Sequence, residues 1–207
     1  STGRPIIAVG FDSPGVVADS IRSDASDAGF ILADHLIRLG HQTIAYFDNL
    51  GDSVCNTAPA IESYELRAGI QCAADNHGIS PTFNCCAGLT STQYSDPKQL
   101  AQAVFSLDRP PSGFIFQPPR YAAEFRTAAQ AIGRTAPDDL SIVCYGCDSP
   151  GPTSDNAITS AQTNIETIGR VVVDLLTRRL ESPGSAPVRV RLSTALDDRG
   201  STGPAHL

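Results

Sequence analysis

The sequence predicts a doubly wound α/β fold built on a parallel sheet, and three observations support this prediction. Short apolar segments alternate along the chain with amphipathic segments of helical length. Most of the apolar segments are continuous rather than alternating, which is typical of strands covered on both faces. Turn residues such as Gly, Pro, Asp and Asn separate them. Strands that alternate with helices of about ten to fifteen residues form right-handed crossovers, so their sheet is parallel.

The first expected strand is Pro5 to Phe11, a short run rich in branched residues that Asp12-Ser13-Pro14-Gly15 closes. A helix follows, which Ser23 or Asp24 can cap and Gly40 ends. The later expected strands are Thr43 to Phe47, Thr82 to Cys86, Gly113 to Gln117, Leu140 to Gly146, Ile158 to Gln162 and Val188 to Leu192, and the later helices are about Glu62 to Asn76, Pro97 to Leu107, Tyr121 to Ile132 and Ile165 to Leu180.

Composition excludes several classes of protein. The 207 residues are 41% hydrophobic and 18% charged, which is ordinary for a globular domain. A net charge of -7 argues against this segment gripping a nucleic-acid backbone, because such segments concentrate Lys and Arg. No run approaches the length of a membrane span. The chain starts at Ser1, contains no Met and enters an apparent strand at once, so we expect a missing part upstream.

The six cysteines are too sparse for a disulfide scaffold. The Cys144-Tyr145-Gly146-Cys147 spacing is typical of a redox pair or half a zinc site, but the histidines show no paired ligand spacing and the motif opens no helix. Cys85-Cys86 fits a strand interior. The sequence contains no nucleophile elbow, phosphate loop, zinc-protease helix or dinucleotide fingerprint. We therefore expect that the chain is not an enzyme and that it binds no cofactor or metal.

Four segments, in the correct order, resemble the effector-binding core of the LacI/GalR family of transcription regulators. They are HLIRLGHQTIAYF (35–47), APDDLSIVCYG (136–146), ITSAQTNIETIGRVVVDLLTRRL (158–180) and LSTALDDRGST (192–202). The resemblance runs from about Ile6 to Thr202. Transport-type binding proteins share this type I periplasmic-binding-protein-like fold, but the Gly-His turn and the Arg-Gly-Ser-Thr ending favour a regulator.

The resemblance implies a nearly complete C-terminal lobe and a partial N-terminal lobe. Residues 1–22 and 163–186 would be the remnant of the N-terminal lobe, with apolar surface exposed, and residues 23–162 and 187–207 the C-terminal lobe. It also implies a cytoplasmic homodimer whose helix-turn-helix headpiece, absent from this chain, binds operator DNA. A small polar metabolite, such as a sugar, sugar derivative or nucleoside, would bind between the lobes. The alternative is a periplasmic sugar-binding protein of an ABC transporter.

Three ligand-contact residues are expected from the family pattern. Asp12 ends the first strand, where the family places a carboxylate against a ligand hydroxyl, although it can also cap its own turn. Arg67 lies near the site where the family has Arg-x-x-Gly. The glycine here is Gly69, so the family's arginine would stand at position 66, which is Leu66, and Arg67 follows it by one residue. A solvated helix-face arginine is the alternative. Gln162 matches the Gln that lines the cleft at the lobe crossover, or it has a structural role there.

The loop after Gly113 to Gln117 departs from the family. An Asn-Asp pair that meets sugar hydroxyls is usual there, whereas this chain reads Gln117-Pro118-Pro119-Arg120. Gln117 and Arg120 are the expected substitutes for ligand contact, and the two prolines make the loop rigid. This departure argues against a simple hexose ligand.

The loop after Leu140 to Gly146 departs as well. The family usually shows Gly-aromatic-Asp-Asp, whereas Gly146 replaces the first Asp here. We expect Asp148 to reach the same space from two residues later. Tyr145 is a further candidate for ligand contact, with packing in the core as its alternative.

Overall fold

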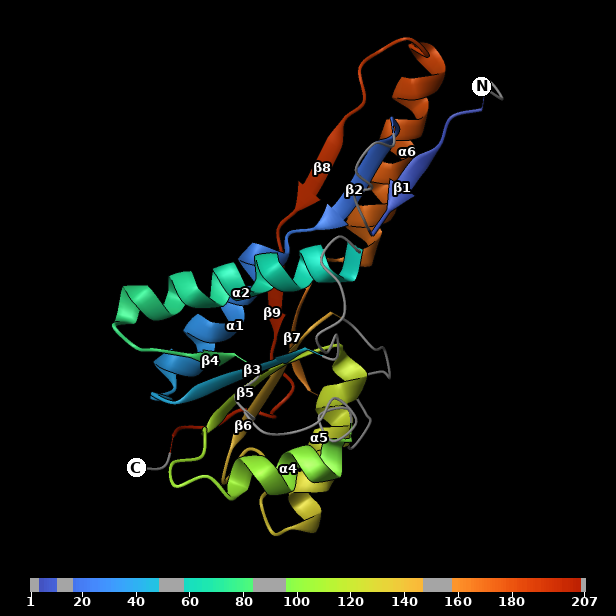
Figure 1. Ribbon diagram of the computed structural model, residues 1–207. Helices are drawn as coiled ribbons and strands as arrows, with labels where there is room; N and C mark the ends of the chain where they lie inside the picture. Colours follow the sequence, from blue (N-terminus) through green and yellow to red (C-terminus); the bar gives the residue numbers. More distant parts are fainter. Residues whose placement is uncertain (1–3, 11–16, 49–57, 84–95, 147–157, 206–207) are drawn as a thin grey trace.

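Two separate sheets organise the chain, one in a larger and one in a smaller lobe (Figure 1). The computed structural model describes residues 4–10, 17–48, 58–83, 96–146 and 158–205. The strands are β1 (Ile7–Val9), β2 (Asp19–Ser23), β3 (Ile44–Asp48), β4 (Thr82–Phe83), β5 (Gly113–Gln117), β6 (Ser141–Tyr145), β7 (Thr159–Gln162), β8 (Arg189–Leu192) and β9 (Ala195–Asp197), and the helices are α1 (Ala25–Arg38), α2 (Ala58–His77), α4 (Pro97–Phe105), α5 (Pro119–Ala131) and α6 (Ile165–Glu181).

The larger lobe is the doubly wound fold that the sequence predicts. Its sheet has the order β4-β3-β5-β6-β7-β9, in which every neighbouring pair is parallel except β7 with β9. Helices α1 and α2 cover one face, and α4 and α5 cover the other (Figure 1). The antiparallel β9 was not predicted.

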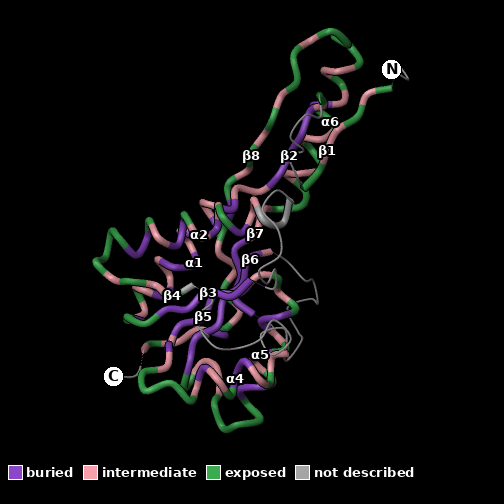
Figure 2. The backbone as a smooth tube through the Cα atoms, in the orientation of Figure 1, coloured by how far each residue is buried: buried purple, intermediate pink, exposed green. Residues whose placement is uncertain are grey.

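Successive residues of β5 show why these strands are apolar throughout. Phe114 and Phe116 point to the face covered by α4 and α5, where both rings pack on Phe125 with centroids 5.1 and 4.8 Å away. Ile115, between them, belongs to the cluster under α1 and α2. Because side chains alternate across a strand, a sheet covered twice buries every position. Figure 2 shows this buried centre.

Helices α1 and α2 approach each other closely through two glycines. A Cβ atom at Gly29 would overlap the backbone carbonyl of Leu66, and a Cβ at Gly69 would overlap that of Ser26. The N-cap of α1 is Asp24, whose carboxylate accepts from the backbone N–H groups of the first turn. The two candidate caps predicted from the sequence are thus resolved in favour of Asp24.

The smaller lobe is a parallel sheet of order β1-β2-β8 with α6 packed on β1 and β2. Asp19 of β2 is fully buried and accepts hydrogen bonds from Arg179 Nε at 2.8 Å and from the backbone N–H of Val188 at 2.7 Å. This ion pair fastens the end of α6 and the start of β8 to the centre of the sheet.

The strand predicted at Val188 to Leu192 does not lie in the larger lobe, where the predicted boundaries place it. As β8 it pairs with β2, so that residues 189–192 belong to the smaller sheet. Only the following β9 returns to the larger sheet. The strand's own pattern carries no information about its partner, because a half-exposed alternation suits either sheet.

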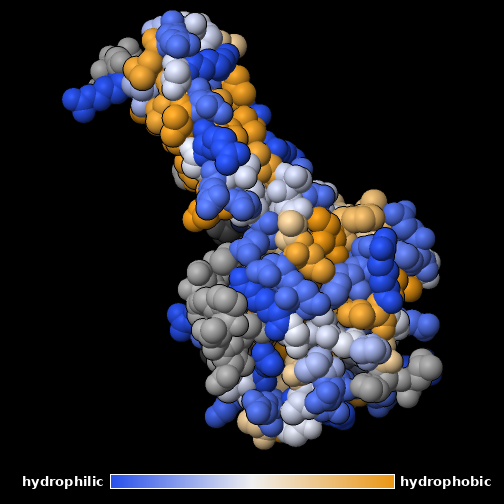
Figure 3. All heavy atoms as spheres, turned by 180° about the vertical axis from the view of Figure 1, so that it is seen from behind, coloured by the Kyte–Doolittle hydropathy of each residue, from blue (hydrophilic) through white to orange (hydrophobic). Residues whose placement is uncertain are grey.

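The smaller lobe also exposes large apolar side chains (Figure 3). They are Ile6, Val9, Val17, Ile165, Val173 and Leu180, with exposed fractions between 47% and 86%. Of α6, only Leu175 is buried. Among the described residues, no helix combines the length and apolar character that a membrane crossing requires.

Candidate ligand-binding site

A cavity of about 900 Å³ opens between the two lobes. On one side are the carboxyl ends of β5, β6 and β7, and on the other is the start of α6. The polar residues that line it are Ser23, Glu62, Gln117, Tyr145, Gln162, Thr163, Asn164, Glu166, Asp197 and Arg199. In open α/β sheets, ligands bind beyond the carboxyl ends of the strands, so this is the expected location for a site.

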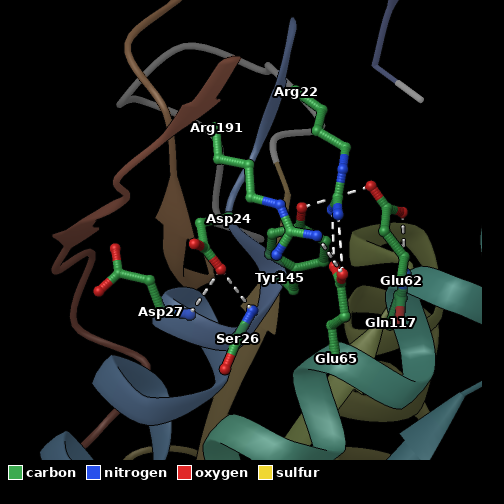
Figure 4. Close-up of polar contacts among 9 residues, drawn as sticks. All are labelled: Arg22, Asp24, Ser26, Asp27, Glu62, Glu65, Gln117, Tyr145 and Arg191. Carbon is green, nitrogen blue, oxygen red and sulfur yellow. Dashed lines mark hydrogen bonds and ion pairs between the residues drawn. The ribbon is translucent and has the colours of Figure 1, made fainter. Parts of the chain in front are cut away.

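Glu62 of α2 lies at the centre of the polar contacts in the cavity (Figure 4). The Tyr145 hydroxyl donates to its Oε1 at 3.4 Å, and the Gln117 side-chain amide donates to its Oε2, also at 3.4 Å. Burial raises the pKa of the Glu62 carboxyl, and the positive charge of nearby Arg22 opposes this rise. The carboxylate therefore faces the cavity with two long hydrogen bonds and room for stronger donors.

Sequence reasoning missed Glu62, because it lies inside a helix rather than at a strand end. The available signal was its spacing. Glu62 precedes Leu66 by four residues, and Leu66 occupies the ligand-contact position of the family's Arg-x-x-Gly motif. Residues four apart share one helix face, so Glu62 was a candidate on that ground.

Tyr145 and Gln117, both predicted as ligand contacts, line the cavity together. Burial raises the pKa of the Tyr145 phenol, and the negative charge of Glu62 raises it further, so the hydroxyl remains a donor. The Gln117 Oε1 accepts from the Tyr46 hydroxyl at 2.9 Å, which orients its amide nitrogen toward Glu62. These three groups thus form one connected network.

Gln162, also predicted, lines the opposite end of the cavity at the exit of β7. Its side-chain amide donates to Asp197 Oδ2 at 3.2 Å. The same carboxylate accepts from Arg199 Nε at 2.8 Å and lies 2.7 Å from its NH2 group. Gln162 therefore has a structural contact as well as a cavity-facing position.

Two predicted contacts lie elsewhere. Arg67 donates to Asp48 at the end of β3 at 2.6 Å, its guanidinium stacks 5.5 Å over the Tyr46 ring, and it is not among the cavity-lining residues. Arg120 is 81% exposed and pairs with Glu124 one helical turn along α5 at 2.7 Å. Both side chains thus bind carboxylates of the chain itself.

The remaining candidates, Asp12 and Asp148, lie outside the described residues, as do Cys147 and the Cys85-Cys86 pair. Cys144 is buried in the core under α4 and α5. Within the described ranges, no group of three or more His, Cys, Asp or Glu side chains could hold a metal ion.

A set of ion pairs joins the two lobes beside the cavity. Arg22 of β2 donates to both carboxylate oxygens of Glu65 at 2.6 and 2.7 Å, and Arg191 of β8 donates to Glu65 Oε1 at 3.0 Å (Figure 4). Glu65 follows Glu62 by three residues on α2, so both carboxylates lie on the same helix face. These ion pairs therefore connect the smaller sheet to the helix that carries Glu62.

Residues 33–202 match the family described as periplasmic binding protein-like domain. The arabinose metabolism transcriptional repressor of Geobacillus stearothermophilus is 24% identical over 166 residues, which is 78% of this chain and 43% of the repressor. The chain spans about half the length of the curated relatives that it matches.

Solved structures of LacI-family regulators have the same fold. A LacI transcriptional regulator from a Rhodococcus species is 25% identical with a TM-score of 0.76, over 98% of this chain and 71% of that one. A LacI-family regulator from Enterococcus faecium, solved with bound ribose, is 22% identical with a TM-score of 0.75, over 99% of this chain and 72% of that one.

Proposed function

The chain belongs to the periplasmic binding protein-like domain family, and from this premise we propose that it is the ligand-sensing core of a DNA-binding transcription regulator. The observation that carries the proposal is the cavity between the lobes, which is lined by a connected polar network of Glu62, Tyr145 and Gln117 on one side and by Gln162 on the other. Such a site suits a small polar metabolite, namely a sugar, a sugar derivative or a nucleoside.

Ligand binding controls the angle between the lobes in this proposal. A ligand that contacts Glu62 on α2 and the start of α6 at the same time stabilises the closed arrangement, because only that arrangement satisfies both sets of contacts. The Arg22–Glu65 ion pair lies beside the cavity and links the smaller sheet to α2. A coupling of about 1 to 3 kcal/mol between ligand and DNA is the usual size for such a switch.

The proposal also covers the parts of the protein outside this chain. They are a helix-turn-helix headpiece and the remainder of the first lobe, to which residues 1–22 and 163–192 of this chain contribute. A homodimer in the cytoplasm presents two headpieces to a palindromic operator. Relatives that are named as transcriptional repressors support a regulator over a transport-type binding protein, and they support binding rather than catalysis.

Thermal unfolding with a series of neutral probes tests the proposed ligand site. The series consists of D-ribose, L-arabinose, D-xylose, D-glucose, cellobiose and adenosine. A ligand at one hundred times its Kd stabilises the folded protein by about 2.7 kcal/mol, which raises Tm by about 5 to 10 °C in a domain of this size. We expect at least one probe to produce such a rise.

The variant Gln162→Ala should reduce this rise in Tm, and Gln130→Ala, an exposed amide at the far end of α5, should leave it unchanged. Gel filtration of the native protein should give a dimer, whereas a transport-type binding protein is expected as a monomer. A series in which no probe changes Tm would contradict the proposed function.

A further inference from the structure

A chain of polar contacts leads from the cavity into the core behind it. It runs from Glu62 through Gln117, Tyr46 and Ser63 to Asp48, with successive distances of 3.4, 2.9, 3.1 and 2.5 Å between the polar atoms. The first two residues line the cavity, whereas the last three are buried and are not among the lining residues. A carboxyl group therefore stands at each end of the chain.

This polar chain has fewer protons than contacts when both carboxyl groups are ionised. An ionised carboxylate only accepts hydrogen bonds, and each hydroxyl donates one. The amide of Gln117 donates in one direction only, because its nitrogen faces one neighbour and its oxygen faces the other. Gln117, Tyr46 and Ser63 together thus supply three donors for four contacts, and one contact must lack a proton.

In this structure the contact without a proton lies between the two hydroxyls. Gln117 donates to Glu62, Tyr46 donates to Gln117 Oε1, and Ser63 donates to Asp48. Both hydroxyl protons are then directed away from the contact between Tyr46 and Ser63, whose oxygens lie 3.1 Å apart.

A proton on Glu62 removes this deficit. The carboxylic acid can donate to the Gln117 oxygen once the amide turns over, and the amide nitrogen then donates to Tyr46. Tyr46 donates to Ser63, and Ser63 donates to Asp48 as before. All four contacts now hold a proton, and donors that point in one direction along a chain strengthen one another.

The surroundings of Glu62 allow it to gain this proton. Burial raises the pKa of its carboxyl above the ordinary 4.5, although Arg22 of β2 faces it and opposes the rise. Glu65, one turn along α2, is bound to Arg22 and to Arg191 (Figure 4). The Tyr145 phenol faces Glu62 from β6, and its raised pKa keeps the hydroxyl protonated.

The other end of the chain is held by an ion pair. Arg67 donates to Asp48 Oδ2 at 2.6 Å, and the same oxygen accepts from Ser63. The Asp48 side chain is only 2% exposed, so this end has little access to solvent. Glu62, which lines the cavity, is thus the end of the chain that exchanges its proton with the cavity.

We propose that Tyr46 and Ser63 are positioning residues of the cavity, which tie the orientation of the Gln117 amide to the protonation of Glu62. The amide N–H faces Glu62 when that carboxyl is ionised, and the amide oxygen faces it when the carboxyl carries a proton. The consequence for a ligand rests on the proposed function, because it concerns the same cavity. A ligand group beside Gln117 accepts a hydrogen bond in the first arrangement and donates one in the second.

A pH titration of the native protein by nuclear magnetic resonance tests the inference without any ligand. It follows the Glu62 carboxyl carbon and the Gln117 side-chain amide, which are assigned from the spectra of Glu62→Gln and Gln117→Leu. We expect both groups to report one midpoint, above pH 4.5. Cross peaks between the Gln117 amide protons and the Tyr46 ring should appear as the pH falls through it.

The variant Ser63→Ala removes the acceptor that receives the Tyr46 proton after the amide has turned over. This arrangement is destabilised, so the midpoint should fall by about one pH unit, which is about a tenfold change in the protonation equilibrium. Ser160→Ala is the matched control. Ser160 of β7 is also buried, and its hydroxyl makes no hydrogen bond within the part of the chain that the structure describes, so the midpoint should stay in place.

The outcomes separate the inference from the proposed function. If the Gln117 amide does not change across the Glu62 titration, or if Ser63→Ala leaves the midpoint in place, the inference is overturned and the proposed ligand site stands. If the midpoints behave as expected but no neutral probe raises Tm, the proposed function fails and the positioning role stands. Should Ser63→Ala not fold, the titration of the native protein still decides.

Discussion

Replacing Gly69 by alanine should destabilise the larger lobe strongly, because the new methyl group has no space. A Cβ atom at this position would lie closer than 3.0 Å to backbone atoms of Ser26 and Phe30 in α1. Backbone atoms cannot rotate away as a side chain can, so α1 and α2 must move apart. Overpacking of this kind costs about 1 to 3 kcal/mol and at times more, and we expect about 3 kcal/mol here.

The variant Gly169→Ala is a matched control within the same chain. Gly169 lies exposed in α6, and nothing is within 4 Å of a Cβ built there. Alanine favours the helix over glycine, so this variant should gain about 0.5 to 1 kcal/mol. Urea denaturation followed by circular dichroism gives both free energies of unfolding. If Gly69→Ala is as stable as the native protein, the close approach of α1 and α2 is refuted.

Two further predictions concern buried polar groups. Asp19→Asn should lower the free energy of unfolding by about 3 kcal/mol, because it removes the charge that holds Arg179, whereas Asp174→Asn on the exposed face of α6 should change it little. Arg179 lowers the pKa of Asp19 below its ordinary 3.8, so its stabilisation is full above that pH and is lost as the pH falls through the folded-state pKa. In acid titrations, the difference in stability between the two proteins should therefore begin to shrink below about pH 4 and keep shrinking as the pH falls, and a difference that stays constant below pH 4 would contradict this. His41→Ala should cost about 2 to 3 kcal/mol in the same urea assay, since it removes a buried ring that bonds the Ser112 and Ser141 hydroxyls at 2.9 and 2.8 Å, and an unchanged midpoint would rule out that role.

The fold could be predicted from the sequence because its signals are local. The predicted strand Gly113 to Gln117 matches β5, and the predicted helix that begins at Ile165 matches the start of α6. A strand buried on both faces must be apolar at every position, and a helix that covers it must be apolar on one side. Both requirements are visible within a few residues.

Strand pairing between the two sheets could not be predicted in the same way. β8 and β9 are separated by only Ser193 and Thr194, yet they belong to different sheets. β2 was not predicted at all, because Ile21 is its only apolar residue, and its charged residues Asp19 and Arg22 find partners far along the chain. Long-range ion pairs leave no trace in the local sequence.

The candidate site shows the same division between local and long-range information. Strand-end residues such as Tyr145 and Gln162 were found, since the carboxyl ends of parallel strands are where ligands bind. The helix-borne Glu62 was missed, and its role depends on contacts with Tyr145 and Gln117 that the fold brings together. The sequence therefore indicated which strand-end residues lie near the cavity, but not which helix residues do.

The chemistry of the cavity follows from the rotational position of α2. Moving an arginine by one residue along a helix turns it by about 100° around the axis. Leu66, at the position where the resemblance expects a ligand-binding guanidinium, is fully buried in the core, and Arg67 points to Asp48 instead. The cavity therefore receives no positive charge from this turn of α2, while Glu62, one turn earlier, supplies a negative one. The turn of α2 at the cavity thus contributes a carboxylate, and the guanidinium beside it comes from Arg22 of β2.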